Sequence, residues 1–61
     1  MAIQDYINLI GSQVTFLDKS VEPHTKHTGV FQGIALLSKD LEDLEFYVDH
    51  ITYSVSETQF I

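Results

Sequence analysis

The stretch that decides the fold is the longest strand that the sequence predicts, and it reads Thr28-Gly29-Val30-Phe31-Gln32-Gly33-Ile34-Ala35-Leu36-Leu37-Ser38. Glycines inside a strand usually mark sharp bends or a close approach of the backbone. On an alternating strand, Gly29 and Gly33 fall on one face with Phe31 between them. We therefore expect residues 28–38 to form a strongly bent strand with Gly33 at a structural bend, which is how a small barrel turns a corner.

Shorter strands are predicted on both sides of this stretch. Before it, apolar and polar residues alternate, and after it the segments are rich in β-branched and aromatic residues. A polar loop around Pro23 and a turn at residues 39–43 separate these segments, and His50 is the expected hinge between two of them. The strands are expected at residues 13–18, 28–38, 44–49 and 51–55, with 58–61 as a candidate for a fifth, very short one.

The N-terminal segment has a helical period instead. Ile3, Ile7 and Ile10 recur at the spacing of one helix face, and Gly11 can supply the left-handed residue that ends a helix. A helix of two to three turns is marginal alone. We therefore expect a helix at about residues 3–10 whose apolar stripe lies on the sheet.

The length and composition predict a single domain spanning residues 1–61. A chain of 61 residues buries only about 60% of its unfolded surface. It has no cysteine to staple the fold, and 44% of its residues are hydrophobic. We therefore expect a homo-oligomer in which copies cover one another. With no basic leader and no apolar run of about 20 residues, neither a signal peptide nor a membrane span is expected, and the predicted location is the cytoplasm.

Two segments resemble a known family. The glycine-containing segment from Gly29 to Ile34 resembles the bent second strand of the bacterial Hfq and Sm families, and the segment from Phe46 to Ile51 resembles their closing strand pair. The resemblance implies a small, strongly bent Sm-like or SH3-like barrel of four or five strands behind a short helix. It also implies rings formed by pairing edge strands between neighbouring copies.

The chain departs from this family where RNA would bind. The family's RNA-facing Asn has no counterpart, and Asp49 replaces a basic residue before the last strands. Nine acidic residues stand against three lysines and no arginine, for a net charge of -6. Because counterion release requires Lys and Arg on one face, nucleic acid is not an expected partner.

Two groups of residues are candidate binding sites. The first has two tyrosines, whose phenols need a polar outlet and so favour the surface, and the hinge histidine. These candidate ligand-binding residues are Tyr47, Tyr53 and His50. The second is an acidic run that is either a solvated rim or a surface complementary to a basic protein. The candidate partner-binding residues are Asp40, Glu42, Asp43, Glu45 and Asp49.

Metal and catalytic chemistry receive little support from the sequence. His24 and His27 are three residues apart in a Pro-containing loop with nothing to fix their geometry, so a solvated loop is preferred to a metal site. The acidic run contains no glycine for a calcium turn. There is no cysteine and no Gly-x-Ser-x-Gly. We expect no catalytic residues, no cofactor and no enzymatic activity.

Two functions remain open at this stage. The first is a non-enzymatic oligomeric binding module, with a small molecule or nucleotide-like metabolite bound at a subunit interface. The alternative is an acidic protein-interaction factor, such as a phage- or mobile-element-encoded inhibitor that occupies a basic surface of its target in the host cytoplasm. The dependence of binding on salt distinguishes the two functions, because association with a basic protein weakens as ionic strength rises.

Overall fold

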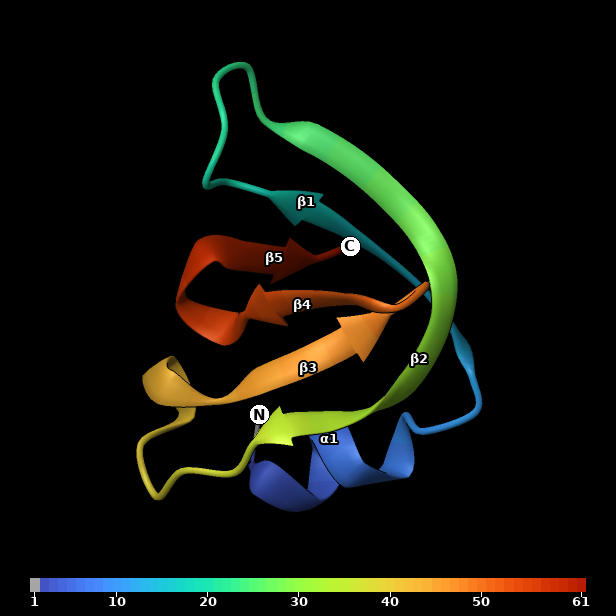
Figure 1. Ribbon diagram of the computed structural model, residues 1–61, viewed down its shortest axis with the longest axis vertical. Coiled ribbons are helices and arrows are strands. Elements are labelled where there is room, and N and C mark those ends of the chain that lie inside the picture. The colour runs from blue at the N-terminus through green and yellow to red at the C-terminus, as the bar shows by residue number, and fades with distance from the viewer. Residues whose placement is uncertain (1) are drawn as a thin grey trace.

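The computed structural model describes residues 2–61 and is mostly β, as predicted, with one antiparallel sheet and one short helix (Figure 1). The sheet order is β4-β3-β2-β1-β5. The two outer strands are not paired with each other in this order, so main-chain hydrogen bonds do not close the sheet into a barrel. The elements are α1 (Ile3–Asn8), β1 (Gln13–Asp18), β2 (Thr25–Leu36), β3 (Glu45–Val48), β4 (Ile51–Ser54) and β5 (Thr58–Phe60), with short 3-10 helices η1 (Leu41–Asp43) and η2 (Val55–Glu57).

The long strand β2 bends around one side of the molecule and serves two partners, as Figure 1 shows. Its first half pairs with β1 and its second half with β3. It begins at Thr25, not Thr28, because β1 provides main-chain partners for residues 25–27 despite their polar side chains. The polar loop is correspondingly shorter than expected. The strand also ends two residues earlier than predicted, at Leu36.

The register of β2 shifts twice against β3, and these shifts overturn the predicted face of Gly33. Phe31 pairs with Val48 and Ile34 pairs with Phe46, with irregularities between them. Because an irregularity breaks the alternation of side chains, Phe31 and Ile34 both face inward although they are three residues apart. Gly33 pairs with the exposed Tyr47 on the outer face.

The core lies inside the bend of the sheet and is dominated by aromatic rings. Phe16, Phe31 and Phe46 are fully buried. The Phe46 ring stacks on Phe31 at 5.1 Å and meets Phe16 edge-on at 5.7 Å, both favourable arrangements for aromatic pairs. The complete set of buried hydrophobic residues is Tyr6, Val14, Phe16, Phe31, Leu44, Phe46 and Val48.

The helix covers one end of this core with a different face from the one predicted. Tyr6 is its buried residue, whereas Ile7 and Ile10 are 39% and 47% exposed. Burial raises the pKa of the Tyr6 phenol, and the nearby Asp5 carboxylate raises it further. The helix ends at Asn8 because a tight turn follows, in which Gly11 has a φ of 90°. Of the predicted stripe, Ile3 packs against the core as expected, whereas the prediction is wrong for Ile7 and Ile10.

The connection between β3 and β4 is a two-residue turn in which both residues have positive φ, 52° for Asp49 and 67° for His50. Such turns match the twist of the two strands that they join. The His50 main-chain N–H donates a hydrogen bond of 2.6 Å to the Gln32 side-chain oxygen, which ties the turn to β2. Neither the helix nor the 3-10 turns of residues 2–61 reach the length and apolarity of a membrane span.

Candidate functional site

Four polar side chains from different parts of the chain gather on the inner face of the sheet, near the start of β2. We call this group the polar mouth, and it consists of Asp18 in β1, His27 in β2, Asp49 in the β3–β4 turn and Tyr53 in β4. Asp18 shares the face of the buried Phe16, because strand residues two apart point the same way. The α1 helix covers the other end of this face (Figure 1), and the polar mouth borders the aromatic core, against which Tyr53 packs.

The Phe16 ring is the floor of the polar mouth. Its centroid lies 4.8 Å from the Tyr53 ring and 5.6 Å from the His27 ring. The Tyr53 and His27 rings are themselves 5.6 Å apart. Phe16 is fully buried, whereas Tyr53 and His27 are only partly buried. A ligand at this surface would therefore meet Tyr53 and His27 and would be supported by Phe16 from beneath.

The absence of a side chain at Gly29 makes room for the Asp49 carboxylate. A Cβ atom placed on Gly29 would lie 2.5 Å from the Asp49 Oδ2 atom and 2.8 Å from the Val48 Cγ1 atom. The Asp49 carboxylate therefore lies directly against the β2 backbone. The turn that carries it is exposed, so this carboxylate remains accessible to solvent.

The electrostatics of the polar mouth favour an anionic Asp18 carboxylate beside a neutral Tyr53 phenol. Two hydrogen bonds from Ser20, one from its hydroxyl and one from its main-chain N–H, lower the pKa of Asp18, with smaller contributions from His27 and His24. Burial raises the pKa of Tyr53, and the charges of Asp18 and Asp49 raise it further. At neutral pH the site therefore presents negative charge around an aromatic ring with an O–H donor.

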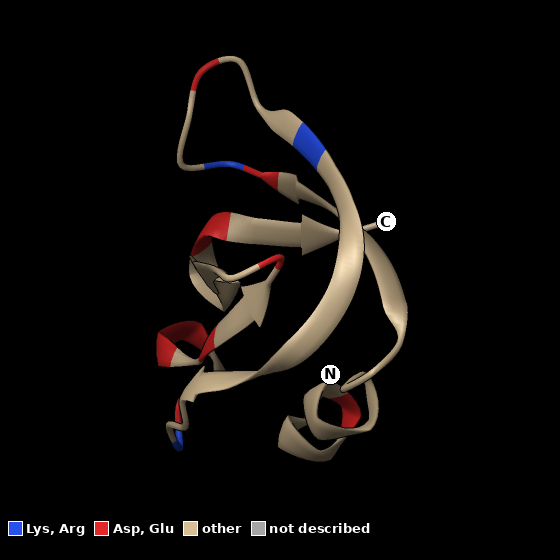
Figure 2. Cartoon of the chain, turned by 45° about the vertical axis from the view of Figure 1, so that its right-hand side comes forward, with Lys and Arg blue, Asp and Glu red and all other residues tan. Residues whose placement is uncertain are grey.

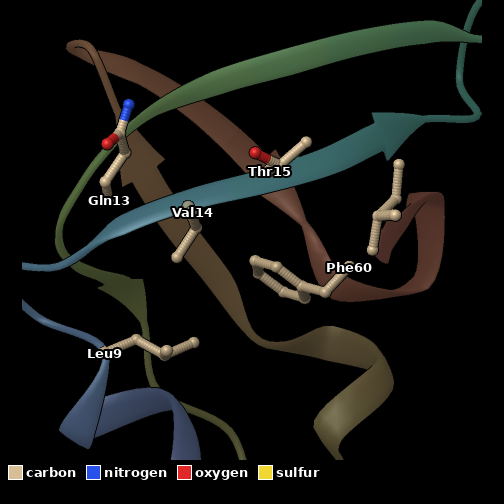
Figure 3. A pocket seen from close by; sticks show the side chains of 6 residues that line it. Leu9, Gln13, Val14, Thr15 and Phe60 are labelled. Atoms are coloured by element: carbon tan, nitrogen blue, oxygen red, sulfur yellow. The ribbon is translucent and has the colours of Figure 1, made fainter.

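A second feature is a hollow of about 340 Å³ with a mixed apolar and polar lining, between the end of α1 and the edge formed by β1 and β5 (Figure 3). We call it the edge hollow. Figure 3 shows Val14, Leu9 and Phe60 on one side of the β1 ribbon and Gln13 and Thr15 on the other. Its lining residues are Leu9, Gln13, Val14, Thr15, Phe60 and Ile61.

The structure separates the three predicted ligand-binding residues. Tyr53 lies in the polar mouth. Tyr47 pairs with Thr52 on the opposite face and is 40% exposed. His50 lies in the exposed turn beside Asp49, with its main-chain N–H bound to Gln32. These three residues therefore do not form one site.

The predicted acidic residues also fall into two places. Asp40, Glu42, Asp43 and Glu45 lie around η1 and at the start of β3, and we call this group the acidic end. Figure 2 shows the acidic part of η1 at the lower left of the molecule. Asp49 follows the other end of β3 and belongs to the polar mouth.

Charge pairing is sparse throughout residues 2–61. Among these residues the ion pair found is between His24 and Glu22, at 3.4 Å. His24 and His27, the histidines considered for a metal, do not join any group of three potential ligands in the described chain. Among residues 2–61, no lysine forms an ion pair with the acidic end.

Sequence reasoning missed Asp18 and His27 as site residues and did not find the edge hollow. The signal for Asp18 was present, because it continues the alternation of Val14 and Phe16. His27 had been placed in a loop, and only its pairing with Phe16 brings it onto the inner face. The edge hollow is formed by residues far apart in the chain, and no local pattern marks it.

No family model, curated protein or solved structure matches this chain.

Proposed function

We propose that this protein is a non-enzymatic binding module that holds a small organic cation in the polar mouth and acts as a homo-oligomer. The observation that carries this proposal is the convergence of Asp18, Asp49 and His27 around the Tyr53 ring. These three residues come from separate elements, and none of them is among the buried residues of the core. They are available to a ligand.

The chemistry of the polar mouth favours a cation over the other small molecules. An ammonium or guanidinium group is attracted to the face of an aromatic ring, and carboxylates beside that ring add charge-assisted hydrogen bonds. A nucleotide-like metabolite carries phosphates that Asp18 and Asp49 would repel. The preferred ligand is therefore an amine or a guanidine, which narrows the small-molecule prediction made from the sequence.

The open edges of the sheet support assembly. The strands β4 and β5 end the sheet order, and each has one side without a partner strand in the part of the chain that the structure describes. Such edges are templates for pairing with another chain, and Ile51 on β4 is 55% exposed. Tyr53 lies in the same edge strand, so a copy paired there would border the polar mouth. The Sm-like resemblance suggests that an Sm-like or SH3-like barrel is completed in this way and that the ligand lies at the subunit interface.

The test combines native mass spectrometry, which gives copy number and any retained ligand, with calorimetric titration of small amines, guanidines and nucleotides. We expect Tyr53→Leu to weaken cation binding about fivefold, whereas Tyr47→Leu on the opposite face should not change it. Asp49→Asn should weaken binding and Glu45→Gln should not. A monomer at micromolar concentration, or preferential binding of nucleotides, would contradict the proposal.

A second candidate is favoured by the acidic end. Its four carboxylates have no lysine partner among residues 2–61, which suits an inhibitor that occupies the basic surface of another protein, such as one encoded by a phage or mobile element. Association through this surface should weaken steeply with salt. Replacing Glu42 and Asp43 by Gln and Asn should also weaken this protein–protein association at a given salt concentration. The same replacement should leave cation binding in the polar mouth unchanged.

A further inference from the structure

The β1 strand extends beyond its partner β5. Phe16, Leu17 and Asp18 pair with β5, and the Ile61 N–H donates a hydrogen bond of 3.0 Å to the Thr15 carbonyl. Within residues 2–61, Gln13 and Val14 are paired on the β2 side, with Val30 and Gly29, and not on the β5 side. In this part of the chain, the first two residues of β1 therefore form a stretch of sheet with one open side.

The main chain of Gln13 faces this open side. The Ser12 carbonyl accepts a hydrogen bond from Phe31 on the β2 side, whereas the Thr15 carbonyl accepts from Ile61 on the β5 side. Because successive residues of a strand direct their N–H and C=O groups to opposite sides, Gln13 has the same direction as Thr15. Gln13 is exposed. It therefore offers a donor and an acceptor to an added strand.

The edge hollow lies beside this open main chain. Val14, Leu9 and Phe60 provide apolar surface on one side of β1, while the Gln13 and Thr15 side chains lie on the other (Figure 3). A strand added here would place alternate side chains on these two sides, since strand side chains alternate. The residue opposite Val14 would enter the apolar side, and the residue opposite Gln13 would lie on the polar side.

We propose that this edge is a strand-addition site for an extended peptide segment of a basic partner protein. The segment lies antiparallel to β1, exchanges main-chain hydrogen bonds with Gln13 and inserts one large apolar side chain into the edge hollow. Extended peptides commonly bind sheet edges in this way, with main-chain bonds for affinity and pockets for specificity. The net charge of -6 favours a segment flanked by lysine or arginine. This site is separate from the polar mouth and does not depend on a ligand there.

The probe is a set of acetylated and amidated heptapeptides, Lys-Thr-X-Thr-X-Thr-Lys, in which X is Phe, Leu, Ile or Val. Binding is followed by the amide NMR signals of the isotope-labelled full chain. We expect saturable shifts at Gln13, Val14 and Phe60 with at least one peptide. The same peptide with N-methyl groups on the amides that face Gln13 should bind at least about fivefold more weakly, because a main-chain hydrogen bond is lost.

A pair of variants at one position separates main chain from side chain. Gln13→Pro removes an N–H that points away from β2, a position where proline is tolerated at an edge, and should weaken binding about fivefold or more. Gln13→Ala keeps the N–H and should bind like the wild type. Leu9→Ser reduces the apolar side of the hollow and should also weaken binding. Circular dichroism melting establishes that each variant is folded.

Several results would overturn the proposal. It fails if no peptide of the set binds, if the N-methylated peptide binds equally well, or if folded Gln13→Pro keeps full affinity. It also fails if the shifts map to the polar mouth, or if Gln13→Pro lowers the copy number in native mass spectrometry, since a second copy would then occupy the edge. Cation binding in the polar mouth should be unaffected by Gln13→Pro.

Discussion

Two glycines in one strand, four residues apart, have opposite environments in this molecule. Gly29 lies under the Val48 side chain and the Asp49 carboxylate, with no room for a Cβ atom, whereas a Cβ atom on Gly33 would meet nothing within 4 Å. The sequence assigns the two positions to one face. The register shift between them separates their faces, so the important glycine is Gly29 and not Gly33.

This difference also divides the strand by role. The first half of β2, with Gly29 and His27, supports the polar mouth and pairs with β1. The second half, with Gly33, pairs with β3 and follows the core around to α1. The two halves of β2 therefore differ although the strand looks uniform in sequence. The β3–β4 turn closely covers the first half at Gly29, whereas the outer face of the second half is open at Gly33.

The largest expected effect is that of Gly29→Val. The new side chain would collide with Asp49 and Val48, and overpacking of this kind costs about 1–3 kcal/mol. The total stability of a domain of this size is only about 3–9 kcal/mol. We expect a markedly lower melting temperature by circular dichroism and loss of the polar mouth. Wild-type melting would show that the turn moves aside freely and that the comparison of the two glycines is wrong.

A second prediction concerns the turn that covers Gly29. His50 has a φ of 67°, and this left-handed conformation costs an L-residue about 1–2 kcal/mol. Glycine adopts it freely. His50→Gly should therefore raise the free energy of unfolding by up to about 1 kcal/mol, measured by urea denaturation. Thr52→Gly in the adjoining strand β4 is the control and should lower it. Destabilisation by both variants would mean that the turn is not strained at His50.

The third prediction uses the pH dependence of the polar mouth. The pKa of Tyr53 is raised in the folded protein, so the stability that this phenol contributes is present below its unfolded pKa of about 10 and is lost as pH rises through the folded pKa. Ultraviolet absorbance follows the phenolate, and subtraction of the Tyr53→Phe profile isolates this residue.

The two carboxylates should contribute unequally to this shift. Asp18 affects the pKa of Tyr53 more than Asp49 does, and burial affects it more than either. Asp18→Asn and Asp49→Asn should therefore each move the Tyr53 titration to lower pH, the first by more. Glu45→Gln at the acidic end is the control. If neither polar-mouth variant moves the titration, the two carboxylates do not act on Tyr53 and the site is not one electrostatic unit.

The smallest effect is expected for Gly33→Val. Its Cβ atom has open space around it, and valine has a higher strand propensity than glycine. We expect a change of less than about 1 kcal/mol in the free energy of unfolding, and no change in copy number by light scattering. Destabilisation as large as that of Gly29→Val would show that a side chain at Gly33 also meets close packing.

The sequence predicted where the helix and the strands lie along the chain, but it did not predict which strands pair or in which register. Residues 13–18 form β1 as expected, and the burial of Val14 and Phe16 follows the alternation that identified this strand. Residues 25–27 did not look like a strand, because their polar side chains give no apolar alternation. They are held in β2 by main-chain hydrogen bonds to β1, which do not depend on side-chain type.

The candidate sites were less predictable than the fold. Tyr53 was chosen because a phenol needs a polar outlet, and it does lie in the polar mouth. Tyr47 satisfied the same criterion and lies on the other face, because Phe46 and not Tyr47 pairs with Tyr53. The criterion identifies side chains that need water at one end, but it cannot assign two of them to one surface.

By itself, the sequence determined that this chain is mostly β with a helix at its start, since periodicity and residue type act over a few neighbouring residues. Only the tertiary structure decided which glycine is covered, that Tyr6 and not Ile7 is the buried helix residue, and that Asp18 and His27 approach Tyr53. These outcomes depend on strand register and on contacts between distant segments. A shift of one residue in register exchanges the two faces of a strand, and no local pattern records where such a shift occurs.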